Sequence, residues 1–183
     1  MSKRNIKVLL STIVFLTAAI YQLFVPPISP QKTQKLPDSV LGQKDGFYVV
    51  TKVVDGDTIE VDIDGKREKI RIIGINSPEA VDPRREVECF GKEASAKAKE
   101  LLSGQKVRLE NDISQAERDK YNRLLRYVFL SNGMDFGKIM IQQGYAYEYT
   151  YDLPYKYQKE YKEAQQLAQT SNIGLWSDGV CGK

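Results

Sequence analysis

The sequence predicts one α+β domain, a small closed barrel of five strands accompanied by three helices. The chain has 183 residues, enough for one domain of ordinary size and an N-terminal extension. Strand-like and helix-like runs follow one another in the order β β β α β β α α. Glycines stand at corners between the short strands, and this arrangement suits a closed barrel better than an open parallel sheet.

Three short runs predict a meander of strands in the first half of the domain. They are residues 47–54 (FYVVTKVV), residues 58–63 (TIEVDI), in which apolar and polar side chains alternate, and residues 69–75 (KIRIIGI). Two turns separate them, residues 55–57 (DGD) and 64–66 (DGK). Asp and Gly are typical of tight hairpin turns because both tolerate left-handed backbone geometry.

A helix and two further strands follow. Residues 92–103 (KEASAKAKELLS) carry apolar side chains at helical spacing, and Gly104 ends this helix. Residues 107–112 (VRLEND) and 124–130 (LLRYVFL) predict the fourth and fifth strands.

Two helices complete the domain. Residues 136–143 predict a short one that ends before Gly144, and residues 155–169 predict a longer one. The longer helix has an apolar stripe at helical spacing, made by Tyr157, Tyr161, Ala164 and Ala168.

The N-terminus predicts a signal peptide or membrane anchor over residues 1–25. Three basic residues precede an uncharged, mainly apolar run from residue 8 to residue 25. As a helix this run spans about 27 Å, close to the hydrocarbon thickness of a bilayer. Because the positive flank stays in the cytoplasm, the following domain is expected outside it, at the cell surface or secreted. The apolar run continues past the small residues 17–19, which favours an uncleaved anchor.

The remaining boundaries follow from composition. Residues 26–45 are rich in Pro, Gln, Lys and Ser and have no apolar period, so they predict a linker. The domain is then expected over residues 46–178, with a C-terminal tail over residues 179–183.

The positive net charge of the chain comes from its N-terminal part. Residues 46–183 hold 21 basic and 22 acidic groups, although the whole chain has a net charge of +3. A polyanion must therefore be bound by a local cluster of Arg and Lys.

The residue inventory narrows the possible chemistry. Histidine is absent from the sequence, which excludes Ser-His-Asp and Cys-His nucleophile systems and His-ligated zinc. Cys89 and Cys181 are the only cysteines. In an oxidising compartment they predict one intramolecular disulfide, and two free thiols are the alternative.

The stretch IRIIGINSPE, residues 70–79, holds the first candidate site. Arg71 lies within an isoleucine-rich strand, where its guanidinium is expected to be partly buried and to meet an anion. That anion is either internal, with Glu79 as the candidate, or a bound ligand. A second arginine, Arg123, stands in the polar turn before the fifth predicted strand, and the DGD turn offers carboxylate oxygens. Phosphodiester hydrolysis requires such components: two arginines, a carboxylate that acts on water and oxygen ligands for a hard cation.

Six motifs in order resemble those of the thermonuclease family, the staphylococcal-nuclease-like domains. The motifs are VVDGDT (53–58), IRIIGINSPE (70–79), FGKEAS (90–95), DKYNR (119–123), QGYA (143–146) and NIGLWS (172–177). The resemblance runs from about Phe47 to Ser177. It implies a five-stranded OB-fold β-barrel with three helices, in agreement with the element order.

The resemblance also implies roles for single residues. The family's two catalytic arginines fall on Arg71 and Arg123, and its catalytic glutamate falls on Glu79. Positions that contact a phosphate of the bound nucleotide fall on Lys120 and Tyr121.

The family's calcium ligands, two aspartates and a backbone carbonyl, fall on Asp57, Asn76 and Ser77. Asp55 falls on an acid that lies next to these ligands and does not contact the ion itself. Asn76 keeps an oxygen but lacks one negative charge, so weaker calcium binding is expected. One of Tyr145, Tyr147, Tyr149 and Tyr151 is expected to stack on a base.

The implied activity is calcium-dependent hydrolysis of DNA and RNA, largely without sequence specificity and with single strands preferred, by a monomer. The alternative is a binding module that has lost catalysis and is tethered to the membrane, because one fold can serve several functions. The retained Arg71, Glu79 and Arg123 favour the enzyme, whereas Asn76 favours the binding module.

Overall fold

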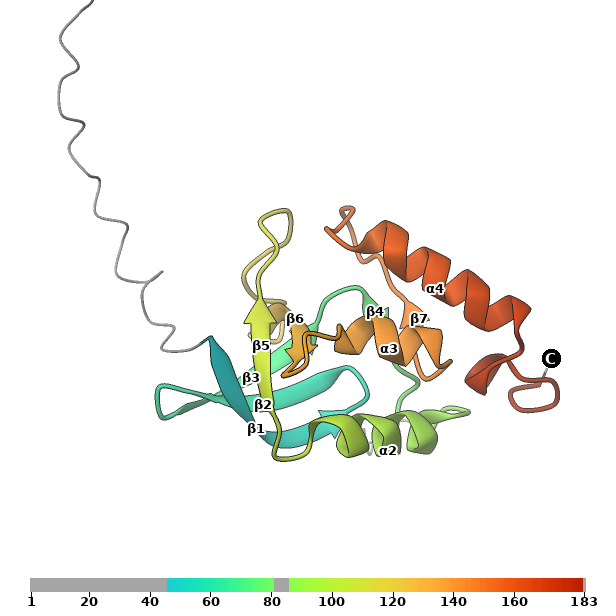
Figure 1. Ribbon diagram of the computed structural model, residues 1–183, viewed down its shortest axis with the longest axis horizontal. Coiled ribbons are helices and arrows are strands. Elements are labelled where there is room, and N and C mark those ends of the chain that lie inside the picture. The colour runs from blue at the N-terminus through green and yellow to red at the C-terminus, as the bar shows by residue number, and fades with distance from the viewer. Residues whose placement is uncertain (1–45, 81–85, 183) are drawn as a thin grey trace, which may run out of the picture. The chain divides into compact units, whose positions relative to one another are not determined.

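Five strands close into a barrel in the order β1–β2–β3–β6–β5, and three α-helices accompany them (Figure 1). This computed structural model describes residues 46–80 and 86–182. The predicted α+β barrel with three helices is confirmed. The predicted segments 1–25 and 26–45 lie outside the described residues. Among the residues that are described, no helix has the length and apolar character needed to cross a bilayer.

The boundaries of most strands agree closely with the strand-like runs of the sequence. The barrel strands are β1 Phe47–Asp55, β2 Thr58–Ile63, β3 Lys66–Ile72, β5 Lys106–Glu110 and β6 Leu124–Leu130. β5 was expected to reach residue 112 but ends at Glu110. Asp112 leaves the ladder because its carboxylate accepts hydrogen bonds from the Tyr127 hydroxyl (2.7 Å) and the Lys156 backbone N–H (2.8 Å).

The barrel closes through two pairings that sequence neighbours do not make. β3 runs parallel to β6, with Arg71 opposite Leu125. β1 pairs with β2 along most of its length and with β5 at its beginning. Its register with β2 shifts between Val50 and Lys52, and a bulge of this kind bends a strand so that it can serve two neighbours.

The predicted third strand, residues 69–75, is wrong at its end. β3 stops at Ile72 because Gly74 has a φ of +79°, which breaks the extended backbone. The chain then forms β4 (Ile75–Asn76), which pairs with β7 (Tyr147–Glu148) in a separate two-stranded sheet. This small sheet places the beginning of the NSPE turn beside the segment that precedes the last helix.

The described part of the chain forms three α-helices, α2 (Gly91–Leu102), α3 (Phe136–Gln142) and α4 (Gln158–Thr170), and a short 3-10 helix, η2, which covers Gly174–Trp176. α4 begins three residues later than expected. Lys156 gives its backbone N–H to Asp112, and the Tyr155 hydroxyl donates to Glu148 at 3.0 Å, so this segment packs as a loop.

The core fills the barrel and the contact between the barrel and the helices. Ala94, Ala98 and Leu102 from α2 are fully buried, as are Tyr127 from β6 and Tyr161 from α4. The Cys89–Cys181 disulfide is confirmed, with its Cα atoms 5.7 Å apart. It ties the predicted C-terminal tail to the start of α2.

Candidate active site

The turn between β1 and β2 forms the floor of the site. Asp55 and Asp57 are both buried there, and the turn packs directly on the NSPE turn. A Cβ atom on Gly56 would lie 2.6 Å from the Ser77 Cβ, so only glycine permits this approach. The Ser77 backbone N–H donates to Asp57 Oδ2 at 3.1 Å. The two turns, which are distant in sequence, are therefore held against each other.

Arg71 points from β3 into this junction, and its side chain is only 13% exposed. Its terminal nitrogens donate to the carbonyls of Ile72 (2.8 Å) and Ile75 (2.7 Å), and one of them lies 3.3 Å from Asp57 Oδ2. The predicted partial burial is confirmed. The anionic partner that the structure records is Asp57 rather than the candidate Glu79, because β2 and β3 place Arg71 beside the β1–β2 turn.

The side-chain oxygen of Asn76 also faces this guanidinium. Asn76 Oδ1 accepts a hydrogen bond from Arg71 at 3.2 Å. The neighbouring Ser77 hydroxyl is buried and has no hydrogen-bond partner among the described residues. The three predicted metal ligands, Asp57, Asn76 and Ser77, thus lie together around Arg71.

Arg123 reaches the same place from the loop before β6. Asp119 orders this loop, since its carboxylate accepts the backbone N–H of Tyr121 and of Arg123, each at 2.9 Å. It also accepts Arg123 Nε at 2.7 Å. Burial alone would raise the pKa of Asp119, but these hydrogen bonds outweigh burial and lower it. The guanidinium of Arg123 is therefore held in one orientation.

Thr58 links the two arginines, a role that the sequence did not indicate. Its hydroxyl accepts a hydrogen bond from Arg123 at 3.3 Å and donates one to Asp57 Oδ1 at 2.8 Å. Thr58 also lies directly opposite Arg71 in the β2–β3 register. The β2–β3 register, which pairs Thr58 with Arg71, is the signal that could have revealed this role of Thr58.

Glu79 is positioned by Glu88, a second residue that was missed. The Glu79 backbone N–H donates to Glu88 Oε2 at 3.1 Å, and the Glu88 backbone N–H donates to the Glu79 carbonyl at 2.8 Å. A Cβ on Gly91 would lie 2.5 Å from that carbonyl oxygen. The beginning of α2 therefore packs against the backbone of Glu79.

Asp55 marks the electrostatic character of the site. Burial raises the pKa of Asp55, and the negative charges of Asp57 and Glu79 raise it as well, to about 6 despite the opposing hydrogen bond from the Gly56 N–H. Asp57 and Glu79 are thus close enough to disfavour the ionisation of Asp55. A cation at this position would relieve that repulsion.

The donor set fits a hard divalent cation. Asp57 and Asn76 offer carboxylate and amide oxygens, and the buried, unpartnered Ser77 hydroxyl lies beside them. Oxygen ligands without nitrogen or sulfur suit calcium or magnesium rather than zinc. Within the described residues, no group of three or more His, Cys, Asp or Glu side chains has an arrangement that could hold a metal ion by itself.

The loop that carries Arg123 also presents an aromatic surface. The Tyr121 ring is 67% exposed. Lys120 Nζ lies 5.1 Å from its centroid, and the Arg123 guanidinium lies 5.3 Å from it. The two predicted phosphate contacts, Lys120 and Tyr121, are therefore adjacent to a catalytic candidate, while their roles stay predictions.

The four candidate stacking tyrosines divide into two kinds. Tyr145 packs on Phe90 and Tyr147 packs edge-on against Trp176, and both residues are partly buried. Tyr149 is 41% exposed and Tyr151 is 76% exposed, and their rings lie 6.3 Å apart. The second pair is therefore the more accessible to a base.

Comparison with known proteins agrees with this geometry. Residues 69–178 match the model of the family described as staphylococcal nuclease homologue. The chain is 44% identical over 131 residues to a thermonuclease of Staphylococcus hyicus, covering 72% of this chain and 76% of that protein. It is 40% identical over 129 residues to a thermonuclease of Staphylococcus intermedius, covering 70% and 75%.

A relative with lower sequence identity is also named as a nuclease. Endonuclease YncB of Bacillus subtilis (strain 168) is 34% identical over 127 residues, covering 69% of this chain and 59% of that protein. The matched regions include the strand that carries Arg71 and the loop that carries Arg123. This chain belongs to the staphylococcal nuclease homologue family.

Proposed function

We propose that this chain is a calcium-dependent nuclease that hydrolyses phosphodiester bonds in DNA and RNA with little sequence specificity. The observation that carries the proposal is the joining of Arg71 and Arg123 through Thr58 and Asp57. Two guanidinium groups from separate segments are held at one point beside a carboxylate. The relatives named thermonuclease and endonuclease support the same activity.

The arginines bind and stabilise the reacting phosphate. Guanidinium groups present planar, paired N–H donors, whose hydrogen bonds strengthen as charge grows on the phosphate oxygens. Asp119 orients Arg123 and Asp57 orients Arg71, so little reorganisation is needed when the substrate arrives. Loss of one such donor lowers the rate by about a hundredfold or more.

Glu79 acts on the attacking water. Glu88 and Gly91 hold its backbone, so its carboxylate starts from a defined position. A water that donates a hydrogen bond to this carboxylate is oriented for in-line attack on phosphorus, and the carboxylate accepts the proton as the water adds.

Asp57, Asn76 and Ser77 would hold the cation. When bound, calcium supplies Lewis-acid polarisation of the phosphate and charge neutralisation. Of these three ligands only Asp57 is charged, so we expect weaker binding than at a site with two aspartates.

The substrate is best supplied as a single strand. Tyr149 and Tyr151 are exposed, and an aromatic ring stacks on a base only when the base face is free. Stacking contributes about 1 to 3 kcal/mol per base and is tolerant of sequence. The proposed enzyme acts as a monomer.

We place this activity outside the cytoplasm. The support is the charge and hydropathy pattern of residues 1–25, together with a disulfide of the kind that persists in oxidising compartments. The chain is then displayed at the cell surface through an uncleaved anchor or released after cleavage.

The deciding experiment is digestion of denatured DNA and of RNA by the purified chain. We expect cleavage with calcium and none with excess chelator, while the variant Glu79→Gln loses activity with calcium present. Absence of cleavage with every divalent metal, together with retention of single-stranded DNA, would establish the non-catalytic binding module instead.

A further inference from the structure

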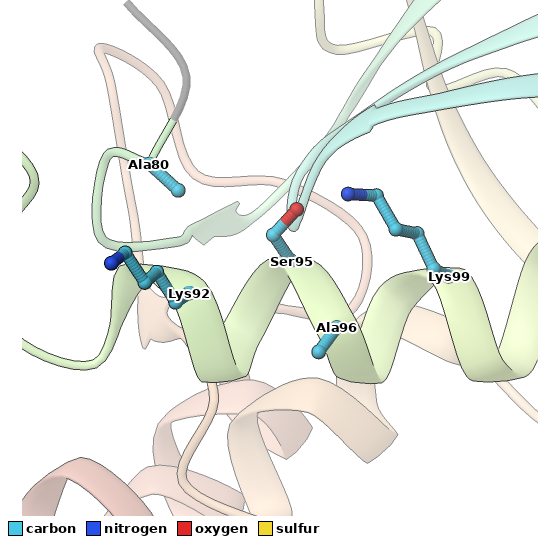
Figure 2. Close-up of a pocket in the computed structure, with 5 residues that line it drawn as sticks. All are labelled: Ala80, Lys92, Ser95, Ala96 and Lys99. Atoms are coloured by element: carbon cyan, nitrogen blue, oxygen red, sulfur yellow. The ribbon is translucent and has the colours of Figure 1, made fainter.

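A second charged site lies beside the catalytic one, on the exposed face of α2. A pocket of about 240 Å³ is lined by Ala80, Lys92, Ser95, Ala96 and Lys99. In Figure 2, Ser95 and Lys99 rise from the same side of α2 towards the strand ends, while Lys92 and Ala80 border the other end of the pocket. Four of the five lining residues therefore come from one helix face.

The polar groups of this pocket have no internal partners. The Ser95 hydroxyl is buried, with the residue only 4% exposed, and it has no hydrogen-bond partner among the described residues. Lys92 and Lys99 form no ion pair with any other described residue, whereas their neighbour Lys97 pairs with Glu100 at 3.0 Å. A buried hydroxyl left unsatisfied destabilises the folded state. A ligand that accepts its hydrogen bond would remove that cost.

The chemistry of the pocket selects an anion. Two ammonium groups repel cations, and both attract a negatively charged group placed above the hydroxyl. Lys92 and Lys99 are seven residues apart, so their Cα atoms are about 10.5 Å apart along α2, and Ser95 lies between them. Two long, flexible lysine side chains can reach one phosphate over that distance.

The pocket lies near the candidate active site. One of its lining residues, Ala80, directly follows Glu79 in the chain. The helix that carries the other four packs on the β1–β2 turn, since the Ala94 Cβ lies 3.5 Å from the position of a Cβ on Gly56. The pocket thus adjoins the segment of Glu79, and its helix contacts the Asp55–Asp57 turn.

We propose that Lys92, Ser95 and Lys99 bind a second phosphate of the polynucleotide, next to the one that is cleaved. This inference rests on the proposed nuclease function and adds to it a path for the strand, over the face of α2 that carries Lys92, Ser95 and Lys99. A polynucleotide carries a phosphate at every nucleotide, so a strand held at Arg71 and Arg123 must place its neighbouring phosphates on adjoining surface.

The test is the salt dependence of binding to a labelled single-stranded oligonucleotide, with chelator present so that nothing is cleaved. For single strands, log K falls with log salt with a slope of about −0.7 per phosphate neutralised. We expect the double variant Lys92→Gln/Lys99→Gln to bind several-fold more weakly at low salt and to lose about 0.7 from the slope. Lys97→Gln, on the same helix, should match the wild type.

Ser95→Ala separates binding from folding. Removing an unsatisfied buried hydroxyl should leave the melting temperature unchanged or raise it, so weaker oligonucleotide binding in this variant reports the site itself. Equal affinity and slope in wild type and double variant would overturn the proposal, as would an effect on inorganic phosphate alone. Cleavage assays on the same proteins are read separately, so a failed nuclease and a failed phosphate site give different results.

Discussion

Two hydrogen bonds join Glu79 and Glu88. The Glu88 side chain accepts the Glu79 backbone N–H at 3.1 Å, and the Glu79 carbonyl accepts the Glu88 backbone N–H at 2.8 Å. Cys89 follows immediately and is bonded to Cys181 near the C-terminus. The position of the proposed catalytic carboxylate therefore depends on residues that have no chemical role of their own.

Glu88→Ala should lower kcat by up to about tenfold. It removes one hydrogen bond to the backbone of Glu79, and such a bond contributes about 1 kcal/mol, where 1.36 kcal/mol corresponds to a tenfold change in rate. Glu88→Gln keeps an oxygen acceptor and should retain most of the activity. Steady-state kinetics on denatured DNA measures both variants, and equal losses in both would contradict a positioning role.

Removing the disulfide should destabilise the domain. The bridge spans 92 residues of sequence, and in the chain-entropy model a loop of that length contributes about 4 to 5 kcal/mol as an upper figure. Urea unfolding of wild type with and without reductant measures the loss. The double variant Cys89→Ser/Cys181→Ser should start at the lower value and not respond to reductant, and a response in that variant would assign the effect to another cause.

Arg71→Lys should lower kcat by at least about a hundredfold while the fold persists. Lysine keeps the charge but cannot make the paired, planar donations to phosphate or reach the Ile72 and Ile75 carbonyls together. Arg67→Lys, an exposed position on the same strand, is the matched control and should retain activity. Circular dichroism verifies the fold, and an active Arg71→Lys enzyme would remove Arg71 from the catalytic set.

Asn76→Asp should tighten calcium binding. It replaces an amide oxygen beside Asp57 by a second carboxylate, and affinity rises with ligand charge. Isothermal titration with calcium measures the change. Asn132→Asp adds the same charge at an exposed turn and should leave the affinity unaltered. No gain in Asn76→Asp would show that charge does not limit this site.

The free energy of unfolding should fall in acid because Asp112 becomes protonated. Burial opposes its ionisation, but hydrogen bonds from Tyr127, Lys156 and Ser114 lower its pKa to about 2 from 3.8. Because the folded-state pKa is the lower one, the stabilisation is present above pH 3.8 and is lost as the pH falls towards 2. The difference in free energy of unfolding between wild type and Asp112→Asn should shrink by about 2 kcal/mol from pH 5 to pH 2.

Acid titration of Asp152→Asn provides the comparison for that experiment, since Asp152 is exposed in the loop before α4. This variant makes the same chemical change at a position away from the hydrogen bonds of Asp112. A difference between wild type and Asp112→Asn that does not shrink between pH 5 and pH 2 would mean that these hydrogen bonds do not favour the ionised carboxylate.

Local pattern in the sequence was sufficient for most of the fold. The strand-like runs 58–63 and 124–130 match β2 and β6 residue for residue, because strand-forming composition and, in the first run, the two-residue side-chain period are local properties. The same holds for the buried stripe of α4 and for the single disulfide that two cysteines allow. The six motifs of the family resemblance supplied the candidate site residues, whose roles stay predictions.

Tertiary structure alone decided how those residues meet. The pairing of β2 with β3 puts Arg71 against Asp57 instead of Glu79, and closure of β3 on β6 brings the Arg123 loop to Thr58. The hold of Glu88 on Glu79 and the unpartnered Ser95 are likewise invisible in the sequence. Periodicity reports which face of an element is buried, whereas the partner of a buried polar group depends on register and closure between distant segments.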